Sequence, residues 1–179
     1  MNIVLRSLSF SFILLMAAQT LMAQEAITPR PSPTAIVTMK YHDTYVKVTY
    51  SQPHKRGRKI FGGLVPFGHV WRTGANEATE ITTTHDIDIQ GNTLPAGTYS
   101  IFTIPRQKEW TVIINKEVGL WGSYNYNQEA DVMRFDVPVQ TLGDAVWEPF
   151  TIGFTQKSDS ADLVMKWDQT QVSIPLLFK

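Results

Sequence analysis

Apolar and polar residues alternate at every second position along much of this chain. The clearest alternating runs cover residues 46–50, 87–89, 133–139, 150–154 and 172–176. A period of two puts successive side chains on opposite faces of a β-strand, whereas an amphipathic helix would repeat about every 3.6 residues. Residues 100–104 and 110–114 are instead apolar on both parities, which predicts central strands covered on both faces.

Turn-forming residues separate these runs, chiefly at residues 90–92, 94–97 and 157–160. No stretch repeats like an amphipathic helix, and at most a short helical turn fits around residues 127–131. Many short strands joined by regular turns predict an all-β fold. We expect an antiparallel, jelly-roll-like β-sandwich of about eight to ten short strands with little or no helix.

The start of the chain has a different composition from the rest. Arg6 precedes an apolar run over residues 8–18, and a small residue follows at a suitable cleavage edge, which is typical of a signal peptide. An uncleaved membrane anchor is the alternative, but the run is short for a membrane span. The next ten residues include three prolines and are interpreted as an extended spacer. The predicted organisation is a signal peptide at 1–23, a Pro-rich linker at 24–33 and one β-sandwich domain at 34–179.

Composition narrows the classes of function. The net charge is +0, so nucleic acid is not an expected partner. There are 0 cysteines, which excludes disulfides, thiolate catalysis, cysteine-ligated metals and a lipid-modified amino-terminal cysteine. The four histidines are scattered without ligand spacing, and no cofactor motif occurs, so we expect no metal and no cofactor. The protein is predicted to be exported to the periplasm or beyond, without a membrane span after cleavage and not as a lipoprotein.

Residues 57–81 combine five glycines with many reactive side chains. Strands at 69–73 and 78–83 joined by a loop at 74–77 would form a hairpin, since Gly and Asn suit a tight turn. Alternation within this hairpin predicts that Arg72 and Glu77 share one face near its tip. They are then either a structural ion pair or a polar site.

In the polar-site interpretation, Arg72 clamps a carboxylate or phosphate through its planar guanidinium, and Glu77 acts as an acceptor or general base. Asn76 lies in the same loop. His69 is a third catalytic candidate, although a lone histidine is more often a surface or core residue.

Two further stretches extend the candidate site. The cationic run at 54–59, which includes Arg58, is either a solvated loop or an anion-binding loop beside Arg72. Residues 119–127 form a polar-aromatic loop in which Trp121 and Tyr124 could stack on a ligand. The alternative is that these two rings cap the end of the core.

The ordered strings in this chain resemble the signature of a bacterial family, the domain of unknown function numbered 2911. They include GRKIFGGLVPFG at 57–68, VWRTGANEAT at 70–79, LPAGTY at 94–99 and WTVI at 110–113. The resemblance extends from about residue 32 to the end of the chain. It implies an exported, single-domain protein of a Gram-negative bacterium, and it brings no activity, catalytic residue or ligand with it.

Three functions stay open on these residues. The best supported is binding of a small polar or anionic ligand, or of a glycan, at the rim of the sandwich. The second is an envelope structural or interaction module without a small ligand. The third is a hydrolase or isomerase with Glu77 as base and Arg72 as clamp. The residues expected to bind the ligand are Arg72, Asn76, Glu77, Arg58, Trp121 and Tyr124.

Overall fold

The computed structural model describes residues 28–178. In it, strands form at the runs of alternating apolar and polar residues. The predicted signal peptide and linker residues 24–27 lie outside the described residues. No helix in the described part is long and apolar enough to cross a membrane. The elements are β1 (Thr34–Tyr41), β2 (Thr44–Ser51), β3 (Thr79–Thr83), β4 (Ile87–Ile89), β5 (Asn92–Leu94), β6 (Gly97–Pro105), β7 (Glu109–Asn115), the 3-10 helix η1 (Gln128–Ala130), β8 (Asp131–Pro138), β9 (Gln140–Thr141), β10 (Trp147–Gln156), β11 (Ser160–Asp168) and β12 (Thr170–Phe178).

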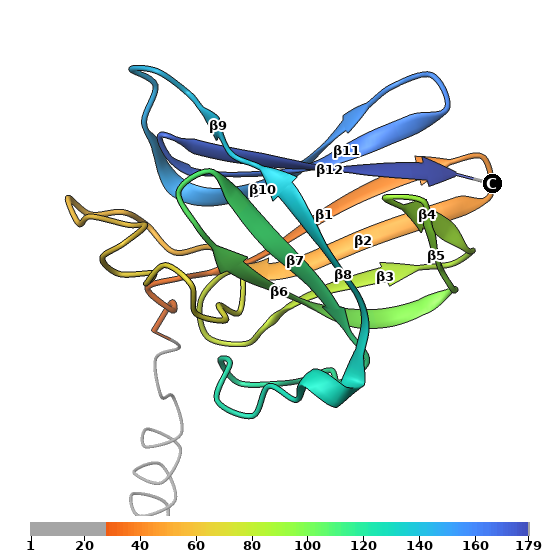
Figure 1. The fold of residues 1–179 in the computed structure, drawn as a ribbon, viewed down its shortest axis with the longest axis horizontal. Coiled ribbons are helices and arrows are strands. Elements are labelled where there is room, and N and C mark those ends of the chain that lie inside the picture. The colour runs from red at the N-terminus through yellow and green to blue at the C-terminus, as the bar shows by residue number, and fades with distance from the viewer. Residues whose placement is uncertain (1–27, 179) are drawn as a thin grey trace, which may run out of the picture. The chain divides into compact units, whose positions relative to one another are not determined.

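The strands form two antiparallel sheets. One sheet has the order β1-β2-β3-β6-β7-β8, and the other has the order β10-β11-β12-β4-β5 with β9 also paired to β12. Figure 1 shows β1–β3 and β6–β8 in one layer and β10–β12 in the other. The all-β sandwich is therefore confirmed, with twelve strands in the described residues where eight to ten were expected.

Internal strands β6 and β7 are apolar on both faces because both faces are covered. On the inner face, Ile101 and Val112 join the main core between the two sheets. On the outer face, Phe102 and Ile113 pack with Ala78 in a second, smaller cluster. Ile104 of β6 also packs against this outer cluster, and the segments that cover it contribute Val70, Leu120 and Tyr126. The two-sided apolar pattern thus follows from loops that fold back over the sheet.

Aromatic rings fill one end of the main core. Trp71 packs against Trp110 at 5.9 Å between centroids and against Phe150 at 5.1 Å. Trp71 also stacks on Trp167, with centroids 5.9 Å apart and an interplanar angle of 18°. Phe61 contacts three of these rings from the side. Large aromatic side chains bury much apolar surface, so this cluster is a major source of stability.

The last residues of the predicted linker contact the domain. The Pro33 carbonyl accepts a hydrogen bond from the Gln52 amide at 2.8 Å. The Ser32 carbonyl accepts one from the Asn76 side chain at 3.2 Å. Residues from Pro31 onward belong to one compact unit. These contacts hold Ser32 beside the loop that follows Arg72.

The predicted hairpin between residues 69–73 and 78–83 is wrong. Strand β3 is paired on one edge with β2 and on the other with β6, so neither edge is left for residues 69–73. Trp71 instead exchanges two backbone hydrogen bonds with Thr103 of β6, at 2.7 and 2.9 Å. One contact between the two segments remains, because the Thr79 amide donates to the Arg72 carbonyl at 3.1 Å. Residues 69–73 therefore follow β6 beyond the end of β3.

Gly63 allows the tight turn that follows Ile60. A Cβ at this position would lie 2.5 Å from the Lys59 carbonyl oxygen, which is backbone and cannot move aside. We expect Gly63→Ala to lower the free energy of unfolding by about 1–3 kcal/mol through overpacking. Gly153→Ala is the control, because a Cβ there meets nothing within 4 Å. That change should raise stability by about 0.4–1 kcal/mol. Equal stabilities of the two variants in urea denaturation would contradict the expectation.

Candidate functional site

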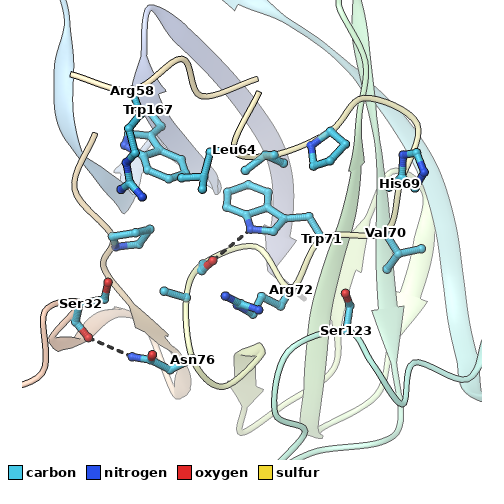
Figure 2. A pocket seen from close by; sticks show the side chains of 15 residues that line it. Ser32, Arg58, Leu64, His69, Val70, Trp71, Arg72, Asn76, Ser123 and Trp167 are labelled. Carbon is cyan, nitrogen blue, oxygen red and sulfur yellow. Dashed lines mark hydrogen bonds between the residues drawn. The ribbon is translucent and has the colours of Figure 1, made fainter. Parts of the chain in front are cut away.

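A cavity of about 410 Å³ opens beside the aromatic end of the core, lined by fifteen residues (Figure 2). Its apolar lining comes mainly from the turn at 64–66 and from two indole rings of the core. The polar side chains that line it are Ser32, Arg58, His69, Arg72, Asn76 and Ser123. The cavity thus brings together four residues that the sequence singled out, from loops near 58 and 69–76.

The charges around this cavity are of one sign. Arg58 and Arg72 both line it, and no Asp or Glu is among its fifteen lining residues. Figure 2 shows the two guanidinium groups approaching the cavity from different sides. Like charges in a concave, partly apolar site raise the local concentration of anions. The cavity is therefore electrostatically suited to an anionic group.

Arg72 differs from the other charged side chains. Its Nε is buried, and it has no hydrogen-bond partner within the described residues, 28–178. No other buried side-chain nitrogen or oxygen in that range lacks a partner. An unsatisfied buried polar group costs about 1–3 kcal/mol. An orphaned buried donor in a native structure calls for an explanation, and Arg72 is also one of the residues that line the cavity.

The backbone around Arg72 is fixed from both sides. The Trp71 Nε1 donates to the Gly74 carbonyl at 3.0 Å, which closes the loop after Arg72. Thr73 is fully buried with φ of 55°, and its Oγ1 lies 3.1 Å from the Thr103 Oγ1. A β-branched residue rarely adopts a positive φ, because the left-handed conformation crowds its side chain. The fold therefore maintains local strain next to Arg72, which is common near functional sites.

Arg58 is held by its own loop. Its Nε donates to the Lys55 carbonyl at 3.0 Å, and its Nη2 donates to the His54 carbonyl. Lys55 in turn pairs with Asp168 of β11 at 2.7 Å, which anchors the loop to the second sheet. Part of the predicted cationic run is therefore structural. Arg58 alone of this run lines the cavity with Arg72.

Asn76 and His69 also line the cavity, and each has a side-chain nitrogen that is already hydrogen-bonded within the protein. The Asn76 Nδ2 donates to the Ser32 carbonyl at 3.2 Å and to the Ser51 Oγ at 3.3 Å. The His69 Nδ1 lies 2.9 Å from the Phe67 carbonyl, and the His69 side chain is exposed. Asn76 therefore braces the loop against the start of the domain, and His69 stands at the rim.

Glu77 lines a second cavity, of about 270 Å³, together with Tyr50 and Glu80. Its Oε2 accepts a hydrogen bond from the Ser51 Oγ at 3.4 Å. Burial raises the pKa of the Tyr50 hydroxyl above its ordinary value, so this phenol stays neutral at physiological pH. The expectation that Arg72 and Glu77 share a face depended on the hairpin, and the two residues line different cavities.

The polar-aromatic loop at 119–127 meets the cavity through Ser123. Trp121 is 57% exposed and Tyr124 is 82% exposed, so neither ring caps the core as the alternative interpretation expected. Neither ring lines the cavity. The backbone of the loop is tied to the Arg72 segment, because the Gly122 amide donates to the Asn76 carbonyl at 2.9 Å.

A hydrogen-bonded network anchors the far end of this loop. The Tyr126 hydroxyl donates to the Asp131 carboxylate at 2.7 Å and accepts from the Arg134 Nη2 at 2.8 Å. Burial, followed by the hydrogen bond to Asp131, raises the pKa of Tyr126. The Arg134 Nε also donates to Asp131 at 2.7 Å. Asn127 caps the 3-10 helix η1 at the position where the sequence predicted a short helical turn.

Gly122 lies close to the Arg72 guanidinium. A Cβ there would lie 2.8 Å from the Tyr124 ring and 3.3 Å from the Arg72 Nη1, and φ is 70°. We expect Gly122→Ala to displace Arg72 and weaken anion binding. Gly119→Ala is a matched control with the same φ of 70° and nothing within 4 Å of its Cβ.

Both glycine variants should lose about 1–2 kcal/mol of stability to the left-handed backbone. Any additional loss of stability in Gly122→Ala relative to Gly119→Ala measures the crowding of Tyr124 and Arg72 by the new Cβ. Thermal denaturation and anion titration of both proteins check this. Identical stability and identical binding in the two variants would contradict the close approach.

The sequence did not single out several residues that line the cavity. Leu64 and Trp167 belong to segments far apart in the chain, and no local pattern connects them. Ser123 belongs to the loop at 119–127, but the polar-aromatic pattern of that loop points to its aromatic residues and not to Ser123. Within the described residues, no group of three or more His, Asp or Glu could hold a metal ion.

Comparison with known proteins gives one result. Neither a curated protein nor a solved structure matches the chain. A family model described as "Protein of unknown function (DUF2911)" matches residues 32–176, the segment that contains every residue lining both cavities. Because this match covers most of the sequence, the chain belongs to the DUF2911 family.

Proposed function

We propose that this protein is an exported binding protein for a small anionic ligand, which it holds in the cavity beside Arg72. The observation that carries the proposal is the buried Arg72 Nε without a partner in the described residues. An anion with two oxygens would complete the hydrogen bonding of the guanidinium, which presents its donors in a planar fork.

The lining of the cavity supports an anion over a neutral sugar. Neutral acceptors occur in the lining at Ser32, Asn76 and Ser123, but carboxylates, which sugar-binding sites commonly use as strong acceptors, are absent from it, whereas two arginines are present. The exposed rings of Trp121 and Tyr124 are also outside the lining. A catalytic pair of Arg72 and Glu77 has no support, because the two side chains line different cavities.

Titration of the purified protein with acetate, phosphate and benzoate tests the proposal. Isothermal calorimetry at low ionic strength is suitable, because salt screens exposed charges. At least one of these anions should bind with a Kd of about 1 mM or tighter, which corresponds to about 4 kcal/mol. Binding should disappear in Arg72→Ala. If no anion binds the native protein, the proposal fails and an envelope interaction module becomes the better description.

A further inference from the structure

We infer that the ligand is an amphipathic organic anion, with a carboxylate-like head at Arg72 and an apolar body against the indole rings. The inference rests on the proposed function and adds the chemical class of the ligand. It distinguishes an aryl or branched-alkyl anion from an inorganic oxyanion, which needs only the head group.

The size of the cavity is the first argument. Its volume of about 410 Å³ lies within the range of about 300–1,000 Å³ that is typical of sites for small organic molecules. An oxyanion alone would leave most of this volume to water. The part of that water beside Leu64, Val65 and Trp71 would lie against apolar carbon, and replacing this part with an apolar group is favourable.

The two indole rings are the second argument. Trp71 and Trp167 both line the cavity and stack on each other. Each ring nitrogen already donates to a backbone carbonyl, Trp71 to Gly74 at 3.0 Å and Trp167 to Glu148 at 3.2 Å. Trp71 is 9% exposed and Trp167 1% exposed, so Trp71 supplies nearly all of the ring carbon that a ligand can reach, with Trp167 stacked behind it, and neither ring offers a free donor. They can bind an apolar or aromatic body, but they add nothing for an inorganic oxyanion.

Leu64 is the third argument. It lines the cavity and is 46% exposed, although the turn around it is closed by four backbone hydrogen bonds. Those bonds fix the backbone, so the exposed leucine is held at the mouth of the cavity. An apolar ligand would remove this side chain from water.

The head group is assigned to Arg72 on the basis of the available donors. Two of the Arg58 nitrogens are engaged with its own loop, at Lys55 and His54. The Arg72 Nε has no partner within the described residues. A planar carboxylate is therefore assigned to the guanidinium of Arg72, and Arg58 contributes positive charge from another side of the cavity.

Binding of benzoate, acetate and phosphate to three proteins tests the inference. These are the native protein, Leu64→Ala, and Val118→Ala as a control of matched exposure at 48% that lines neither described cavity. Benzoate should bind the native protein at least about tenfold more tightly than acetate, which corresponds to about 1.4 kcal/mol. Leu64→Ala should weaken benzoate about five- to tenfold and leave acetate within about twofold. Val118→Ala should change neither affinity.

The outcomes separate the two proposals. If acetate or phosphate binds as tightly as benzoate in an Arg72-dependent way, that result would overturn the proposal of an amphipathic ligand but would retain the proposal of an anion site. Unchanged benzoate affinity in Leu64→Ala would do the same. Absence of any binding to the native protein would overturn both.

Discussion

Replacing Arg72 with methionine is expected to weaken anion binding at least about 100-fold, equivalent to about 2.7 kcal/mol, without lowering the stability of the unliganded protein. Methionine keeps an apolar stem of similar length but removes the buried Nε that lacks a partner. Removing an unsatisfied buried donor relieves its desolvation cost, so the free energy of unfolding should stay unchanged or rise by about 1 kcal/mol. This combination is typical of a residue kept for function at some expense of stability.

Arg134→Met is the matched control. The Arg134 guanidinium is satisfied by Asp131 at 2.7 Å and by Tyr126 at 2.8 Å. Its replacement should lower the free energy of unfolding by about 0.5–1 kcal/mol and leave anion binding intact. Urea denaturation and calorimetry of both variants provide the comparison. If Arg72→Met were the less stable of the two, Arg72 would have a structural role.

The second large effect is expected at Trp71, which belongs to both the core and the cavity. Trp71→Ala should lower the free energy of unfolding by about 3–5 kcal/mol, since a buried Trp is lost and a void remains. It should also abolish ligand binding, because the ring lines the cavity and its Nε1 closes the loop at Gly74. Domains of this size are stable by about 5–15 kcal/mol, so the variant should fold but with a small margin.

Trp110→Ala distinguishes the two roles of the aromatic cluster. Trp110 packs against Trp71 and Phe61 but does not line the cavity. Trp110→Ala should lose a similar amount of stability to Trp71→Ala. It should still bind benzoate at low temperature, where the Trp110 and Trp71 variants are both folded. Trp71→Phe supplies a milder change if the alanine variant does not fold. Equal loss of binding in the Trp71 and Trp110 variants would mean that the cavity responds only to global stability.

The two-residue period predicted most of the fold because it reports directly which side of each strand is buried. The apolar character of both faces at 100–104 and 110–114 predicted central strands, and β6 and β7 are internal in their sheet. The turn predicted at residues 90–92 joins β4 to β5, and the structure has Gln90 and Gly91 both at positive φ. These features depend on neighbours in sequence, so a local pattern is sufficient.

The site was less predictable because it depends on contacts between distant segments. Residues 69–73 have the composition of a strand, but the edge of β3 that they would need is occupied by β6. Trp167 reaches the cavity from β11, nearly a hundred residues after Trp71. No local sequence pattern predicts that these two residues line the same cavity. Arg58, Arg72 and Asn76 were singled out by their residue type, and their role in binding stays a prediction.

Nitrogen–proton correlation spectra of the arginine side chains test the central claim most directly. The Nε–H signal of Arg72, assigned by its loss in Arg72→Met, reports on the atom that lacks a partner. During titration with benzoate this signal should shift progressively and saturate, while the Arg134 signal stays fixed in its pair with Asp131. An Arg72 signal that does not move, or that moves only as all the arginine signals do with ionic strength, would contradict an anion site at Arg72.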